Sequence, residues 1–201
     1  MPLHFLLKPR LLSSALIASS LLLGGCNDAP NAGATGASEK STSVPLSEAA
    51  LAEQATGFSV GSPVNARTVY VFFDAQCPHC GDLWNAAKPL KPQARFVWIP
   101  VGIINASSTA QGASILAAAN PVAEMDKHEA SLLARKGGIS ARQGIDAQKA
   151  SVAKNTELME SFGFASIPAI IGTHTQTGAM VRQEGAMPTA ALAKVLGLKV
   201  P

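Results

Sequence analysis

The sequence contains little cysteine and little net charge. Three cysteines in 201 residues are too few for a miniprotein held together by several disulfide bonds. The formal charge is only +3, and two of the positive residues, Lys8 and Arg10, lie in an N-terminal segment with the composition of a removable leader. The remaining chain is therefore close to neutral, which gives no indication of a nucleic-acid-binding surface. A hydrophobic fraction of 47% argues against a disordered chain, and the length suits one globular domain.

Residues 1–26 have the pattern of a secretory signal. A basic start is followed by an apolar stretch over residues 11–23, which is short for a bilayer span. The stretch ends in Leu-Gly-Gly-Cys at Cys26, which resembles a bacterial lipoprotein cleavage box and implies lipidation of that cysteine. Cleavage by the ordinary signal peptidase and retention as an uncleaved anchor are the alternatives. All three interpretations export the rest of the chain to an oxidising compartment.

The next segment predicts a tether and a short helix. Residues 27–47 are rich in small and polar residues and have almost no large apolar ones, so they are expected to form a flexible tether. Ser47 can cap a short helix over residues 48–56. We assign residues 48–62 to this linker helix and a lead-in, and residues 63–201 to the main domain.

The main domain alternates between strand and helix patterns. Residues 68–73 form a continuous β-branched and aromatic run, typical of a strand buried on both faces. A helix is expected to begin near Pro78, and residues 95–104 predict a strand interrupted at Pro100. The later predictions are helices capped by Ser107 or Ser108, by Asn120 and by Asp146, hairpin strands over residues 169–171 and 180–182, and a helix over residues 188–196. This order predicts an α/β layer architecture.

The motif Cys77-Pro78-His79-Cys80 carries the strongest chemical signal in the chain. It follows the first predicted strand and starts a helix, so the two thiols fall on one helix face. Unpaired backbone N–H groups at the helix start, and a protonated His79, would lower the pKa of Cys77. Cys80 lies one turn into the helix and is expected to be more buried and less acidic. An acidic thiol is a good leaving group, so a disulfide here would be easily reduced.

Other uses of these thiols remain open. A zinc site needs four ligands, and the body of the chain has no second Cys-x-x-Cys. A c-type haem needs histidine after the second cysteine, where Gly81 stands. A copper carrier could combine the thiolates with His79, His128, His174 or Met180. A structural disulfide would close only a very short loop, which gains little chain entropy. A substrate-holding module with incidental thiols is a further alternative.

The sequence resembles a thioredoxin-fold protein of the Dsb class, and specifically the DsbG/DsbC catalytic domain. The resemblance covers about residues 67–198. The stretches that carry it are residues 72–80, 100–104, 113–117, 120–121, 157–163 and 166–169.

The resemblance implies an α/β, thioredoxin-like fold with a helical insertion at about residues 107–163, between the second and third core strands. It also implies that Pro168 is cis and faces the active disulfide, and that the backbone at Ile167 pairs with a substrate segment. Two features differ from DsbG and DsbC. Only about forty residues separate Cys26 from the first predicted strand, so we expect no dimerisation domain and a monomer. Ile167 stands where those relatives have threonine, and the Pro-His dipeptide resembles the oxidase DsbA.

The implied function is a periplasmic, lipid-anchored thiol–disulfide oxidoreductase that reduces, isomerises or exchanges disulfides in exported proteins. Cys77 and Cys80 would be catalytic, and a membrane reductase such as DsbD would recharge them without a metal or organic cofactor. The alternatives are a monomeric DsbA-like dithiol oxidase and a copper-binding thioredoxin-fold lipoprotein. Asp74 is interpreted as a turn residue, or else as a carboxylate that tunes proton transfer.

The remaining histidines and the tryptophans are assigned structural places. We expect His128 and His174 to lie on the solvated surface, and Trp84 and Trp98 to pack in the core.

Overall fold

The computed structural model describes residues 45–61, 63–64 and 67–201. Predictions for residues 1–44, including lipidation of Cys26, lie outside the described residues. The helices are α1 (Glu48–Gln54), α2 (Pro78–Ala87), η1 (Lys88–Leu90, a 3₁₀ helix), α3 (Ala106–Leu116), α4 (Pro121–Leu133), α5 (Asp146–Ser161) and α6 (Thr189–Leu196). The strands are β1 (Phe58–Val60), β2 (Thr68–Asp74), β3 (Arg95–Val101), β4 (Ala169–Thr173) and β5 (Met180–Glu184). None of these helices is both long and apolar enough to span a bilayer.

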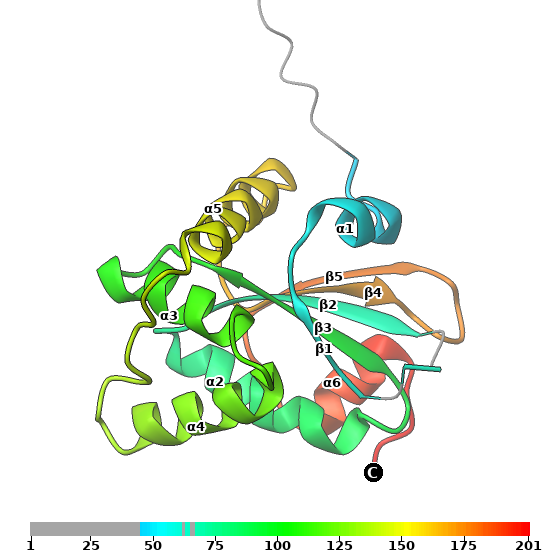
Figure 1. Ribbon diagram of the computed structural model, residues 1–201. Coiled ribbons are helices and arrows are strands. Elements are labelled where there is room, and N and C mark those ends of the chain that lie inside the picture. The colour runs from blue at the N-terminus through cyan, green and yellow to red at the C-terminus, as the bar shows by residue number, and fades with distance from the viewer. Residues whose placement is uncertain (1–44, 62, 65–66) are drawn as a thin grey trace, which may run out of the picture. The chain divides into compact units, whose positions relative to one another are not determined.

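The five strands form one sheet in the order β1-β3-β2-β4-β5 (Figure 1). Strands β2 and β3 are parallel, and the other neighbouring pairs are antiparallel. The predicted central strand is confirmed, because β2 lies between β3 and β4 and is buried along almost its whole length. The predicted hairpin of the two last strands is also confirmed.

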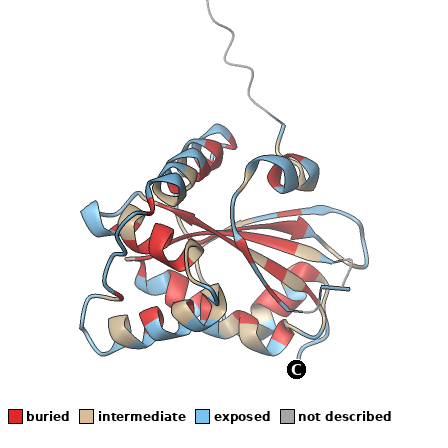
Figure 2. Ribbon diagram, in the orientation of Figure 1, coloured by how far each residue is buried: buried red, intermediate tan, exposed pale blue. Residues whose placement is uncertain are grey.

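Side chains alternate between the two faces of the sheet, and helices cover both faces. Val71 and Phe73 of β2 belong to the core cluster shared with α2 and α6, whereas Tyr70 and Phe72 belong to the cluster shared with α1 and α5. Figure 1 shows this three-layer arrangement, and Figure 2 shows that the buried residues concentrate in the sheet and on the inward helix faces. Strand β2 therefore contributes buried side chains to the packed core on both faces of the sheet.

Two tryptophans anchor the α2 face of the core, as the sequence predicted. Trp84 of α2 and Trp98 of β3 are almost fully buried, with ring centroids 4.9 Å apart in an edge-to-face arrangement. Burying one such ring contributes roughly 2–3 kcal/mol. This contact fixes α2, and therefore the start of α2, against the sheet.

The prediction that Pro100 interrupts the second strand is wrong, because β3 continues through it. Arg95 donates its N–H to Arg67 O on the β2 side. Alternate residues face opposite sides of a strand, so the nitrogen of Pro100 faces away from β2. Pairing with β1 ends at Trp98, so no partner there needs the N–H that proline lacks. Asn155 donates its side-chain N–H to the Pro100 carbonyl at 3.0 Å.

The lead-in that follows the first helix contributes a strand to the sheet. Phe58–Val60 pairs antiparallel with β3 as an edge strand that the sequence analysis did not predict. The helix before it is capped by Ser47 as predicted but ends at Gln54, and its Leu51 is fully buried. A three-residue strand is too short for a periodic pattern, which explains why the prediction missed it.

The three helices between β3 and β4 confirm the predicted helical insertion. Asn120 caps α4 as predicted, but two other caps differ from the predictions. Asn105, rather than a serine, caps α3, and the hydroxyl of Ser108 accepts the Asn105 N–H in return. Ile145 precedes α5, so Asp146 lies in the first turn instead of at the cap position.

Candidate functional site

The two cysteines of the described residues lie where β2 passes into α2. Cys77 is the N-cap residue of α2, and Pro78 takes the first helical position. Cys77 donates its N–H to Asp74 O at 3.0 Å, and Cys80 donates its N–H to Cys77 O at 3.0 Å. Both thiols point into the α2 side of the core; Cys77 is 4% exposed and Cys80 is 0% exposed. A tight turn and one helical turn therefore bring the two sulfurs together.

The environments of the two thiols separate their acidities. A hydrogen bond from the Cys80 thiol is the largest cause that lowers the pKa of Cys77, from 9.0 to about 7. Burial opposes this change, and the backbone N–H groups of Cys80 and His79 support it. Burial, ahead of the nearby Cys77 charge, raises the pKa of Cys80 far above the ordinary value. Near neutral pH, Cys77 is therefore partly ionised and Cys80 holds its proton, as the sequence predicted.

His79 contributes less to this acidity than its place in the motif suggested. Its charge is the smallest of the resolved causes that lower the pKa of Cys77. Nδ1 of His79 lies 3.4 Å from Oδ2 of Asp82, and both side chains are mostly exposed. Most of the shift therefore arises from buried hydrogen bonds, which solvent screens less than it screens an exposed ion pair.

Asp74 is completely buried and holds two loops together. Its carboxylate accepts backbone N–H groups from Gln76 at 2.8 Å, from Ile103 at 2.8 Å and from Ile104 at 3.0 Å. These bonds connect the turn before Cys77 to the loop that follows β3. The structure supports the interpretation of Asp74 as a turn residue and adds its contact with the second loop.

Pro168 lies at the same end of the sheet. The Ile167–Pro168 peptide bond is cis, and Ala169, the first residue of β4, pairs with Phe72 of β2. Continuing this antiparallel register places Ile167 opposite the end of β2, where the cysteine turn begins. The partly buried side chain of Ile167 packs against the core cluster that contains both cysteines. The fold therefore gathers the candidate residues of two distant segments.

His128 does not lie on the surface as predicted. It is completely buried, and its Nε2 contacts the carbonyl oxygen of Ala75, two residues before Cys77. Its Nδ1 accepts the N–H of Ile139 at 3.2 Å. Both ring nitrogens are occupied, so His128 cannot join the thiols in the copper arrangement considered above. No group of three or more histidine, cysteine or acidic residues among the described part of the chain is placed to hold a metal ion.

Glu129 is a residue of this site that the sequence pattern did not predict. The residue is 7% exposed, and its carboxyl group lies against Gly81, the residue after Cys80. Helical spacing offered one available signal: Met125 is fully buried, and positions 128 and 129 follow it by three and four residues on the same face of α4. A polar pair at inward-facing positions indicates either a buried network or a functional group.

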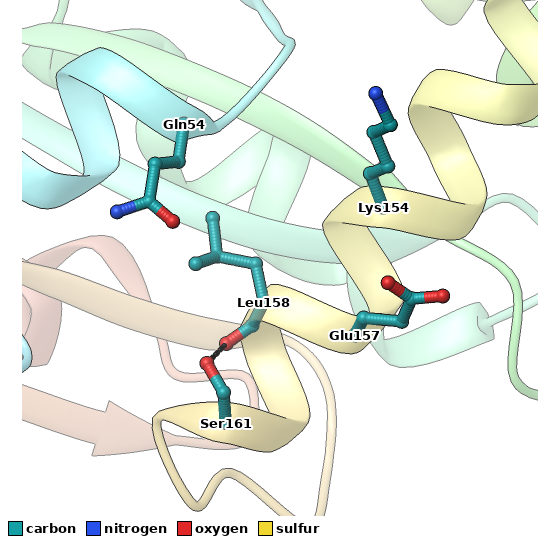
Figure 3. Close-up of a pocket in the computed structure, with 5 residues that line it drawn as sticks. All are labelled: Gln54, Lys154, Glu157, Leu158 and Ser161. Carbon is teal, nitrogen blue, oxygen red and sulfur yellow. Dashed lines mark hydrogen bonds between the residues drawn. The ribbon is translucent and has the colours of Figure 1, made fainter. Parts of the chain in front are cut away.

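Two surface depressions differ in their relation to the thiols. One of about 180 Å³ borders the cysteine motif and is lined by Gln76, Pro78, Gly81, Asp82, Glu129, Leu132 and Leu133. The other, of about 480 Å³, is lined by residues of α1 and α5, including Gln54 and Leu158 (Figure 3). These helices pack on the face of the sheet opposite the cysteines. The smaller depression is therefore the one adjacent to the candidate chemistry.

The sheet order, the Cys-x-x-Cys motif at a helix start and the cis-proline before β4 define a domain with a thioredoxin-like fold. Solved structures share this fold. The catalytic domain of Proteus mirabilis ScsC gives a TM-score of 0.57 at 17% identity, with 74% of this chain and 91% of that chain covered. A periplasmic thioredoxin-like protein from Salmonella enterica serovar Typhimurium gives 0.58 at 19% identity, with coverages of 74% and 92%. Alpha-DsbA2 from Wolbachia pipientis gives 0.57 at 18% identity, with coverages of 74% and 91%.

Sequence comparison shows that this thioredoxin-fold domain is similar to DsbG proteins. The thiol:disulfide interchange protein DsbG of Pseudomonas aeruginosa is 37% identical over 153 residues, which are 72% of this chain and 57% of that protein. DsbG of Escherichia coli K12 is 35% identical over 106 residues, with coverages of 51% and 42%. The matches thus span about half the length of these relatives. No protein-family model matches the chain.

Proposed function

We propose that this chain is a periplasmic thiol–disulfide oxidoreductase that reduces, isomerises or exchanges disulfides in exported proteins, as the name of its DsbG relatives suggests. The observation that carries the proposal is the difference in acidity between the two thiols. Cys77 has a pKa of about 7 and receives a hydrogen bond from Cys80, whose own pKa is raised by burial. One sulfur is thereby prepared for attack and the other is held in reserve.

The proposed reaction has two steps. The Cys77 thiolate attacks one sulfur of a substrate disulfide; a Cys77–substrate bond forms, and the other substrate sulfur leaves as a thiolate. Cys80 then gives up its proton and attacks the Cys77 sulfur, which forms the Cys77–Cys80 disulfide and releases the second substrate thiol. The substrate gains two electrons and the protein loses two. In reverse, the same steps oxidise a substrate dithiol.

The surface beside Cys77 supports binding of an extended, partly apolar substrate segment. The backbone at Ile167, next to cis-Pro168, lies at this end of the sheet and is the candidate for pairing with the segment. Ile103 and Ile104 are 40% and 47% exposed, although their amides are fixed by the buried carboxylate of Asp74. Exposed apolar side chains on a fixed backbone suit recognition of an unfolded or misbonded chain.

A trapping experiment tests this function. The Cys80→Ala variant should accumulate mixed disulfides between Cys77 and exported proteins, because the resolving thiol is absent. The adducts would be detected by non-reducing electrophoresis and identified by mass spectrometry. A Cys77→Ala variant serves as the control and should form none. Absence of adducts from Cys80→Ala, with Cys77 reactive toward a small alkylating agent, would contradict the proposal.

A monomeric dithiol oxidase is the second candidate, favoured by the Pro78-His79 dipeptide between the thiols. The reduction potential of the Cys77–Cys80 pair separates the two. A potential near −120 mV, the approximate value for DsbA, would indicate an oxidase, and one near −270 mV, the approximate value for thioredoxin, would indicate a reductase. Equilibration with glutathione buffers and sedimentation of the same sample would measure potential and oligomeric state together.

The proposal extends to attachment of the domain to a membrane and to re-reduction of its disulfide. Lipidation of Cys26 would hold the domain at a bacterial membrane, where a DsbD-like reductase could reduce the Cys77–Cys80 disulfide. Incorporation of a labelled fatty acid, lost in the Cys26→Ser variant, tests the anchor. Accumulation of the oxidised pair in a strain without the membrane reductase tests the recharging step.

A further inference from the structure

The carboxyl group of Glu129 is buried at the start of α2 without a complete set of partners. Its Oε1 is inaccessible to solvent and has no hydrogen-bond partner among the described residues. The other oxygen, Oε2, lies so close to Gly81 that a Cβ atom added there would collide with it. Only glycine after Cys80 leaves room for this carboxyl group.

Glu129 lines a surface depression that borders the cysteine motif. The depression of about 180 Å³ that Glu129 lines is also lined by Gln76 and Pro78, the two neighbours of Cys77 in the chain. Because Glu129 lines this depression, its carboxyl group can exchange a proton with water or a thiol that enters it. Buried polar atoms without partners are rare, and they point to a functional role.

The charges around Glu129 favour its protonated form. Burial, then the charges of Cys77 and Asp82, raise the pKa of Glu129 to about 7, while Lys88 opposes them. Cys77 caps α2, Asp82 lies within it, and Lys88 follows its last residue at the start of η1. On its own helix, His128 is uncharged because its Nδ1 accepts a hydrogen bond, and Asp126 pairs with Lys88 at 2.8 Å.

The coupling between Cys77 and Glu129 acts in both directions. A negative charge on Cys77 disfavours ionisation of Glu129. By linkage, a negative charge on Glu129 disfavours ionisation of Cys77 by the same free energy. Because both groups titrate near pH 7, one proton is shared between two sites that do not readily carry negative charge together.

We propose that Glu129 acts as a general base and then a general acid: it takes the proton displaced when Cys77 becomes a thiolate and returns it when that charge moves to the substrate. This inference rests on the function proposed above. In the forward step, Cys77–SH and Glu129–COO⁻ become Cys77–S⁻ and Glu129–COOH. Attack on the substrate disulfide transfers the electron pair to the leaving substrate sulfur, which then takes the proton from Glu129. The products are a neutral substrate thiol and Glu129–COO⁻, so protons and charge balance.

The first test uses the unmodified sequence. The carboxyl carbon of Glu129 is followed by NMR across pH in the reduced protein, before and after Cys77 is capped with iodoacetamide, which leaves it uncharged. The titration midpoint of Glu129 should fall by about half a unit to one unit after capping. An unchanged midpoint would overturn the proposal.

The second test uses variants of α4. Glu129→Gln keeps the size of the side chain but cannot ionise, so the rate of Cys77 alkylation against pH should become a single step with a midpoint about half a unit lower. Glu129→Asp should restore a broad profile. Glu124→Gln, on the same helix with its carboxyl 3.6 Å from Arg142, is the control and should match the unmodified protein. A Glu129→Gln profile identical to the control would contradict the proposal.

The two proposals fail in different ways. If Cys80→Ala captures no substrate, the oxidoreductase function fails regardless of Glu129. If substrate is captured but capping Cys77 leaves the Glu129 titration unchanged, only the role of Glu129 fails.

Discussion

The imidazole of His128 and the carbonyl oxygen of Ala75 are joined across 53 positions of the chain. Because Nδ1 of His128 accepts the Ile139 N–H, the proton resides on Nε2, which donates to Ala75. The bond fixes the inserted helix α4 to the turn that presents Cys77. Since Glu129 follows His128 directly on α4, the same contact sets the position of the carboxyl group beside the thiol helix.

Replacing His128 with alanine should destabilise the domain. The change leaves the Ala75 carbonyl and the Ile139 amide buried without partners and opens a cavity, which together cost about 3 kcal/mol. Urea unfolding measures the loss. His79→Ala, which removes a mostly exposed histidine, should change the free energy of unfolding by no more than about 0.5 kcal/mol. Equal losses in both variants would refute the assigned contact.

Two buried groups of α4, His128 and Glu129, should make the stability depend on pH in opposite directions. Burial lowers the pKa of His128, so the unfolded chain binds more protons and stability falls as the pH drops below about 6.5. Burial raises the pKa of Glu129 from 4.5 to about 7, so the folded state binds the extra proton. That contribution is complete below about pH 4.5 and is lost as the pH rises to about 7, a change of about 3 kcal/mol.

The Glu129→Gln variant separates these two effects. It should lack the loss of stability that Glu129 causes as the pH rises from 4.5 to 7, and it should keep the loss that His128 causes as the pH falls below about 6.5. Chemical unfolding at closely spaced pH values would show the difference. The assignment fails if the variant and the unmodified protein give parallel curves.

Asp74→Asn should weaken the join between the cysteine turn and the loop after β3. Asp74 accepts three backbone N–H groups, whereas an asparagine side chain offers one acceptor oxygen and turns an NH₂ group toward donors. We expect a loss of about 2–4 kcal/mol in the free energy of unfolding. Hydrogen exchange at the amides of Ile103 and Ile104 should accelerate. Unchanged protection of these two amides would show that the carboxylate does not hold the loop.

The acidity of Cys77 should depend on its partner sulfur more than on His79. Because a hydrogen bond from Cys80 is the largest cause that lowers the pKa of Cys77 to about 7, Cys80→Ala should shift the alkylation midpoint upward by about one unit. Cys80→Ser keeps a donor and should give a smaller shift. His79→Ala should shift the midpoint least. A larger effect from His79→Ala than from Cys80→Ala would reverse this order of causes.

Much of the site could be predicted because its signals are local. The apolar run of β2 and the proline at the first helical position specify where a strand ends and α2 begins, and Cys77 and Cys80 fall on either side of that start. Hydrophobic periodicity, caps and fixed φ values each act within a few residues, so the sequence shows them directly. The prediction that Pro168 is cis came from the resemblance to the Dsb class, because local sequence patterns do not show which bonds before proline are cis.

Tertiary structure alone decided which polar groups lie beside the thiols. Glu129 and Gly81, and His128 and Ala75, come together only when α4 packs against α2. In the same way, β1 exists because β3 offers it a free edge. Whether a carboxyl or an imidazole is buried, and hence how its pKa moves, depends on neighbours brought in from distant parts of the chain. The sequence by itself determined where the two sulfurs enter the helix; packing determined the groups that control their protons.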